Sequence, residues 1–185
     1  MPNNRIRKIV ITGALGAISV VLGVTRWGFI PWVSGASLTV MHIPVIIGAV
    51  LEGPVVGTLI GLIFGVSSLL QAAINPISPT DPWFVNPLLS VLPRLFIGPV
   101  SWLVYNALKK SKVLSIIAAG LAGSLTNTVL VLGMIGVLGY APFAVLAPIV
   151  VLNGLPEAVV SAIITLAVVA AWQQIEVGKK GGSNI

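Results

Sequence analysis

The sequence predicts an all-α membrane protein, a bundle of six transmembrane helices that forms one domain over residues 1–185. Two observations predict this class. The chain is 57% hydrophobic and only 8% charged, with a mean hydropathy of +1.09, far from the average of soluble proteins. Long apolar stretches also recur from Ile9 to Trp172, and about 20 helical residues cross a hydrocarbon core. The bilayer is therefore the expected solvent.

Charges and helix breakers divide the chain into six segments. The first follows a basic cluster, as a signal peptide does, but further spans follow and no clear cleavage site ends it. Glu52 and Gly53 end the second segment, which is short, and Pro54 starts the third. Asn86 and Pro87 start the fourth. We expect helices at residues 6–24, 38–51, 54–73, 86–108, 113–138 and within 143–175.

The last apolar segment is too long for one straight span. It contains Asn153, Gly154 and Pro156, and proline removes a backbone donor and disrupts a helix. We therefore expect a break there. Free backbone groups at membrane depth are tolerated only where protein or a cavity satisfies them, and broken helices near substrate recur in transporters.

The distribution of cations predicts the orientation. Six spans place both termini on one side, together with the loops at residues 52–53 and 109–112. That side holds eight of the ten lysines and arginines, so the positive-inside rule makes it cytoplasmic. The eight are Arg5, Arg7, Lys8, Lys109, Lys110, Lys112, Lys179 and Lys180.

Two long connections fall on the outer side, at residues 25–37 and 74–85. Both are rich in aromatic residues and proline, so they form either a lid or an interfacial aromatic belt. Their aromatic residues are Trp27, Phe29, Trp32, Trp83 and Phe84.

Small residues at four-residue spacing predict close helix packing, because lipid tails provide no hydrophobic force between helices. Gly57, Gly61 and Gly65 form such a stripe in the third segment, and we expect them to pack inside the bundle. Gly13 and Ala17 form a shorter stripe in the first. That stripe fits internal packing or contact with another subunit equally well.

Arg94 interrupts an apolar segment at residues 85–108, and Glu157 interrupts the last one. An ionisable residue within a span costs about 2.5 to 3.5 kcal/mol on insertion scales, so it usually faces a cavity. Further polar residues fall in the outer halves of the predicted helices, which predicts a pocket open to the outside. They are His42, Ser67, Ser68, Gln71, Asn86, Asn127 and Asn153.

Each polar residue also has a structural interpretation. His42 suits a hydrogen-bonded helix interface, and Asn86 beside Pro87 suits a helix N-cap. Asn127 is suited to hydrogen bonding between helices. Arg94 and Glu157 are also able to neutralise each other as an ion pair.

Several function classes are excluded. The chain has no cysteine, no phosphate-binding GxxxxGK[ST] loop, no HExxH and no GxSxG. Its four acidic residues are too few for a proton relay, and its clustered cations do not form a nucleic-acid face. We expect no catalytic residues, metal or cofactor, and favour a binding subunit powered by another protein.

Four segments resemble the substrate-binding S components of energy-coupling factor (ECF) vitamin transporters, most closely the pantothenate-type branch. They cover nearly the whole chain. They are LTVMHIPVIIGAVLEGPVVGTLIGLIFG from Leu38, FVNPLLSVLPRLFIGPVSWLVYNALKK from Phe84, GSLTNTVLVLG from Gly123 and NGLPEAVVSAII from Asn153.

The resemblance implies a subunit of a prokaryotic plasma membrane that captures a vitamin outside the cell. It would dock on a transmembrane scaffold subunit driven by two ATP-binding subunits. The family's scaffold contact is typically Ala-x-x-x-Ala on the first helix, where Gly13 and Ala17 have the analogous spacing in this chain. Ala14 is followed by Ile18 at that spacing, so the exact register of the contact stays open. The implied pocket contains Asn86, Arg94, Asn127, Asn153 and Glu157, and we add His42 and Trp32 as expected binding residues.

Pantothenate carries one carboxylate besides hydroxyl and amide groups. Arg94 suits the carboxylate, Asn127 and Asn153 suit the hydroxyls and amides, and Glu157 would orient Arg94 or accept a hydroxyl. Hydroxymethylpyrimidine, folate, riboflavin and a pyridoxine-type vitamin stay open as ligands, with stacking on Trp27, Phe29 or Trp32 for a flat one. One alternative belongs to a different function class: a small membrane enzyme or scaffold in which Arg94 and Glu157 form a structural pair.

Overall fold

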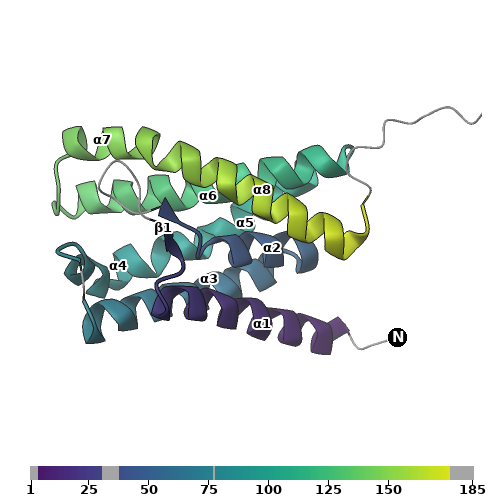
Figure 1. The fold of residues 1–185 in the computed structure, drawn as a ribbon, viewed down its shortest axis with the longest axis horizontal. Helices are drawn as coiled ribbons and strands as arrows, with labels where there is room; N and C mark the ends of the chain where they lie inside the picture. Colours follow the sequence, from purple (N-terminus) through teal and green to yellow (C-terminus); the bar gives the residue numbers. More distant parts are fainter. Residues whose placement is uncertain (1–3, 31–37, 77, 176–185) are drawn as a thin grey trace, which may run out of the picture.

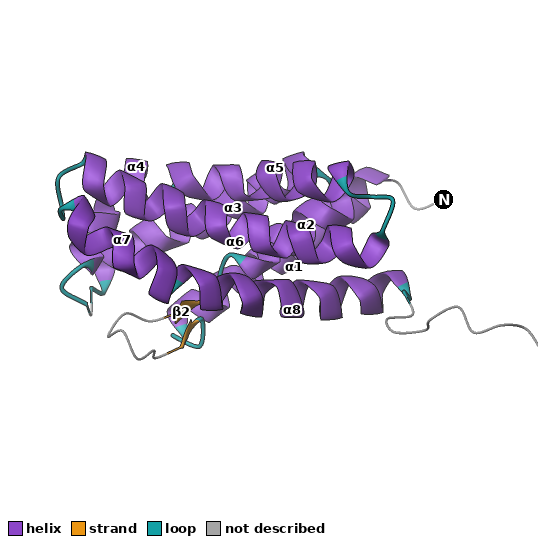
Figure 2. Cartoon of the chain, turned by 90° about the horizontal axis from the view of Figure 1, so that it is seen from above, coloured by secondary structure: helices purple, strands orange, loops and turns teal. Residues whose placement is uncertain are grey.

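The structure is a computed structural model, and it describes residues 4–30, 38–76 and 78–175. Helices arranged along one long axis form a bundle, with a short strand pair beside it (Figures 1 and 2). The elements are α1 (Asn4–Val24), β1 (Phe29–Ile30), β2 (Leu38–Thr39), α2 (Ile43–Glu52), α3 (Pro54–Ile74), the 3-10 helix η1 (Asp81–Val85), α4 (Pro87–Ser90), α5 (Leu92–Ala107), α6 (Lys112–Val137), α7 (Phe143–Leu152) and α8 (Gly154–Gln173).

Five helical stretches are long and apolar enough to cross a membrane, so the chain is an all-α membrane protein, as the sequence predicts. The short apolar α2 is the additional helix. The five stretches are Asn4–Val24, Pro54–Ile74, Pro87–Ala107, Lys112–Val137 and Phe143–Gln173.

The start of α1 and the end of α8 lie at the same end of the bundle, while α4 and the start of α7 lie at the other end (Figure 1). An ion pair between Arg7 and Glu52, 2.7 Å long, joins the start of α1 to the end of α2 at that first end. The sequence also predicts that Arg7 and Glu52 lie on the same side of the membrane.

The second helix starts later than the sequence predicts. Leu38 and Thr39 pair with Ile30 and Phe29 as antiparallel strands, and α2 begins only at Ile43. The prediction of a helix from residue 38 was wrong because an apolar run this short does not separate strand from helix by its periodicity.

The fourth helix is interrupted at Val91, between α4 and α5, where the sequence predicts one continuous span. Pro93 follows two residues later and has no N–H to continue the hydrogen-bond ladder. The predicted break in the last segment is confirmed, since α7 ends at Leu152 and α8 starts at Gly154.

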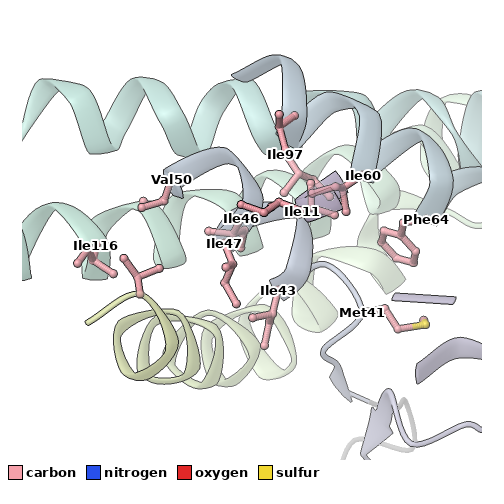
Figure 3. Close-up of a cluster of buried hydrophobic side chains, with 14 residues drawn as sticks. Ile11, Met41, Ile43, Ile46, Ile47, Val50, Ile60, Phe64, Ile97 and Ile116 are labelled. Atoms are coloured by element: carbon pink, nitrogen blue, oxygen red, sulfur yellow. The ribbon is translucent and has the colours of Figure 1, made fainter. Parts of the chain in front are cut away.

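The core surrounds α2, whose residues from Ile43 to Val50 are all buried. A helix that is apolar on every side belongs inside a bundle. Ile46 and Ile47 lie at the centre of the cluster, and Phe64 and Met41 lie together at one end of it (Figure 3). The core therefore leads directly into the cavity described below, which both of these residues line.

The glycine stripe of α3 packs against α4 and α5, which confirms the predicted internal role. A Cβ at Gly57 would contact the Cα of Gly98, and a Cβ at Gly61 would contact the carbonyl oxygen of Arg94. A Cβ at Gly65 would approach the Cα of Val91 within 2.8 Å. Because these three glycines have no side chain, the backbone of α5 around Arg94 is able to lie close to α3.

Candidate ligand-binding site

A cavity of about 100 Å³ lies in the half of the bundle that contains the end of α1 and the start of α5. It combines charged, amide, hydroxyl and aromatic side chains. Its walls come from the connection after α1, from β2, from the second half of α3, from η1, and from α5 and α6. The lining residues are Arg26, Phe29, Thr39, Met41, Phe64, Ser68, Gln71, Ala72, Asp81, Phe84, Arg94 and Asn127.

Arg94 is the charged group placed deepest in this cavity, with only 5% of its surface exposed. Its Nη1 donates to the carbonyl oxygen of Leu89 at 2.5 Å. Its guanidinium carbon lies 5.3 Å from the ring centre of Phe64 and 5.4 Å from that of Phe84, within the range of a cation–π contact. The buried Nε has no hydrogen-bond partner among the described residues.

Arg94 and Glu157 do not form the ion pair that the sequence left open. Two ion pairs occur in the described part of the chain, and neither joins these residues. Glu157 instead accepts hydrogen bonds from Thr39 and Thr128. The positive charge of Arg94 is therefore not neutralised by direct contact with a described carboxylate.

Asn127 lies in the cavity wall with 6% of its surface exposed. Its Oδ1 is buried and makes no hydrogen bond to any residue the structure describes. A buried polar atom without a partner is costly. Arg94 and Asn127 therefore each offer a polar atom that a bound molecule would satisfy, one as a donor and one as an acceptor.

His42 is fully buried at the N-terminus of α2 and does not line the cavity. Neither of its ring nitrogens has a hydrogen-bond partner within residues 4–30, 38–76 and 78–175. Asn86 caps α4, because its Oδ1 accepts from the Leu88 amide at 3.0 Å. Its Nδ2 donates to the Tyr140 hydroxyl at 3.4 Å.

The remaining predicted residues are placed as follows. Asn153 is buried at the junction of α7 and α8 and does not line the cavity. Trp32 lies outside the described residues, and Trp27 is 82% exposed. Phe29, Asp81 and Phe84 come from the two outer connections and contribute to the wall.

Sequence reasoning missed Arg26 as a site residue. Arg26 has a left-handed backbone, with φ of 64°, a conformation that is uncommon outside glycine and often found at functional sites. Its Nη2 lies 3.8 Å from Asp81 Oδ2 and donates to the Asn75 carbonyl at 3.5 Å. The available signal was charge, because Arg26 and Asp81 are the two charged residues of the predicted outer connections.

A larger hollow of about 490 Å³ lies between α5 and α6, but it lacks suitable chemistry. Its one polar side chain, Thr126, already donates to the Ala122 carbonyl. Such a surface suits lipid tails and offers nothing to orient a polar molecule. Its other lining residues are Phe96, Val100, Ala122, Leu125, Val129 and Leu130.

The fold and the cavity define a multi-pass membrane protein with a buried cationic site at one end of its bundle. The described part of the chain contains no group of three or more His, Cys, Asp or Glu residues that could hold a metal ion. Residues 7–169 match the family model for the substrate-specific component of ECF transporters. The chain belongs to this family, so it is a transport subunit and not an enzyme.

Two relatives have names that specify a substrate. The chain is 29% identical to the pantothenic acid transporter PanT of Lactococcus lactis, over 92% of this chain and 96% of the relative. It is 31% identical to the pantothenate transporter PanT of Leuconostoc mesenteroides, over 70% of this chain and 68% of the relative.

Proposed function

We propose that this chain is the membrane subunit that captures pantothenate and delivers it inward with an ATP-driven scaffold. The names of two relatives support this ligand. One structural observation carries the proposal, the buried Arg94 guanidinium with no carboxylate of the described residues paired to it. A buried cation in a low-dielectric cavity favours a ligand that brings one negative charge, and pantothenate brings one carboxylate.

In this proposal Arg94 donates to the carboxylate of pantothenate. Its Nε, and the guanidinium N–H groups that do not bond the Leu89 carbonyl, are available for charge-assisted hydrogen bonds. Asn127 accepts from a hydroxyl or amide through its Oδ1. Ser68 and Gln71 line the same cavity from α3 and supply further hydrogen-bonding groups. Asn153, His42, Asn86 and Trp32 stay predicted binding residues.

The cavity must enlarge to hold a vitamin. Its volume of about 100 Å³ is below the roughly 300 to 1,000 Å³ typical of small-molecule sites. Phe84 is the wall residue that would move, because the ligand carboxylate would replace its cation–π contact with Arg94. Ligand binding therefore displaces Phe84, as in induced fit.

The topology proposed with this function has six membrane helices and both termini in the cytoplasm, in a prokaryotic plasma membrane. The ion pair between Arg7 and Glu52 and the shared end of α1 and α8 support it. The proposed partners are one transmembrane scaffold subunit and two ATP-binding subunits. Gly13 and Ala17 support a scaffold contact on α1, because both are exposed and a Cβ at Gly13 would meet nothing within 4 Å.

Mass spectrometry of the small molecule that co-purifies with the detergent-solubilised protein tests the proposal, followed by titration of free vitamins into stripped protein. We expect pantothenate to be retained and to bind far more tightly than hydroxymethylpyrimidine or riboflavin. Tight binding of another vitamin, without pantothenate binding, would overturn the ligand. No binding across the panel would overturn capture itself.

A further inference from the structure

The carboxylate of Glu157 connects three elements that are distant in the sequence. Its Oε1 accepts from the Thr39 amide at 2.7 Å and from the Thr39 hydroxyl at 3.4 Å. Its Oε2 accepts from the Thr128 hydroxyl at 3.3 Å. The first turn of α8 is thereby joined to β2 and to α6.

The strand β2 depends on contacts of this kind. Each strand of the pair has only two residues, and a two-stranded hairpin is marginally stable by itself. The bond from the Thr39 amide to Glu157 is charge-assisted, and such bonds are roughly twice as strong as neutral ones. It is also partly buried, with Glu157 only 7% exposed.

Glu157 does not line the cavity, whereas Thr39 and Met41 do. We propose that Glu157 is a positioning residue, which holds the Thr39 and Met41 wall against α6 and α8 and does not contact the ligand. This inference rests on the proposed function for its effect on binding. The position of the wall itself does not depend on which ligand is bound.

The other strand of the pair, β1, has a weaker attachment through the residues that precede it. Arg26 connects the residues before β1 to Asp81 at 3.8 Å and to the Asn75 carbonyl at 3.5 Å. Both contacts are long, and the Arg26 side chain is 37% exposed, so solvent screens them. Loss of Glu157 would therefore not be compensated from that side.

Hydrogen–deuterium exchange of the full, ligand-free chain in detergent tests the wall directly. In Glu157→Ala, we expect exchange at the Thr39 amide to become roughly tenfold to hundredfold faster, the range for losing a hydrogen bond to a charged group. Glu157→Gln retains an acceptor oxygen and should restore part of the protection. Ser161→Ala is the control, since it removes a buried hydroxyl one turn further along α8.

Ligand dissociation rates then separate positioning from contact. We expect Glu157→Ala to speed release of pantothenate, and by the same factor to speed release of analogues that each lack one hydroxyl. If the effect vanished for one analogue, Glu157 would contact that hydroxyl and the inference would be wrong. Unchanged Thr39 exchange in Glu157→Ala would also overturn it.

The exchange experiment uses no ligand, so the two proposals fail separately. Loss of Thr39 protection without any pantothenate binding would contradict the proposed ligand and support the wall. Normal pantothenate binding with unchanged Thr39 protection in Glu157→Ala would support the ligand and overturn the role of Glu157.

Discussion

The guanidinium of Arg94 donates to the carbonyl oxygen of Leu89, which is the backbone acceptor that Pro93 leaves without its usual partner. In a regular helix, the amide of residue 93 would donate to the carbonyl of residue 89, but proline has no N–H. The interruption between α4 and α5 therefore supplies a buried acceptor, and Arg94 uses one of its donors to satisfy it. This bond orients the guanidinium next to Phe64 and Phe84.

Substitution of Arg94 should abolish tight binding without unfolding the bundle. Arg94→Gln removes the charge that pairs with the ligand carboxylate, and losing one partner of a buried charged pair costs about 2 to 5 kcal/mol. Arg94→Lys should recover only part of the affinity because an ammonium lacks the planar fork of donors. Isothermal titration measures both, and thermal unfolding in detergent shows whether each variant is folded. Normal affinity in Arg94→Gln would refute the carboxylate contact.

Gly61→Ala should weaken ligand binding although Gly61 does not line the cavity. The added Cβ would contact the Arg94 carbonyl and push α5 away from α3, and overpacking of this kind costs about 1 to 3 kcal/mol. We expect lower thermal stability together with a weaker pantothenate affinity. Gly133→Ala is the matched control, since a Cβ there meets nothing within 4 Å. Equal behaviour of the two variants would contradict this role for the glycine stripe.

Gly13→Leu should uncouple transport from capture. The new side chain would project from an exposed position on α1, so the bundle and the cavity stay intact. It would prevent the close backbone approach that small residues allow between membrane helices. We expect normal pantothenate affinity in the isolated subunit and loss of ATP-dependent uptake in vesicles that contain the full transporter. Gly133→Leu, on α6, is the matched control. Uptake that survives in Gly13→Leu would place the scaffold contact elsewhere.

Asp81→Asn should increase the association rate constant of an anionic ligand. It removes the partner of Arg26 at the cavity and leaves a positive charge there, which increases electrostatic attraction. The cost to stability should stay below about 1 kcal/mol, as for exposed ion pairs. Stopped-flow association at low and high salt tests this, because screening weakens the extra attraction. An association rate that is unchanged at low salt would contradict it.

Local signals made some features predictable. Pro156 and Gly154 marked the break between α7 and α8, and the glycine spacing of α3 marked a packing face. Arg94 stood out because a single cation in a long apolar segment has few other uses. Each of these signals lies within one segment of the chain.

Long-range contacts explain what the sequence did not predict. The strand at Leu38 and Thr39 is hydrogen-bonded to Glu157, which lies 118 residues beyond Thr39. The ion pair between Arg26 and Asp81 joins two separate connections. The sequence around each residue does not indicate that the two residues pair. The interruption at Val91 follows from Pro93, but α5 also contains Pro99 without ending there, so proline alone does not locate the break.

The central claim is that Arg94 binds the carboxylate of pantothenate. Its most direct test titrates pantothenate and the alcohol analogue, in which CH₂OH replaces the carboxylate, into the natural protein and Arg94→Gln. We expect the analogue to bind the natural protein much more weakly than pantothenate does, and Arg94→Gln to weaken pantothenate binding without weakening analogue binding further. Equal losses for both ligands in Arg94→Gln would show that Arg94 does not contact the carboxylate, and would contradict the account.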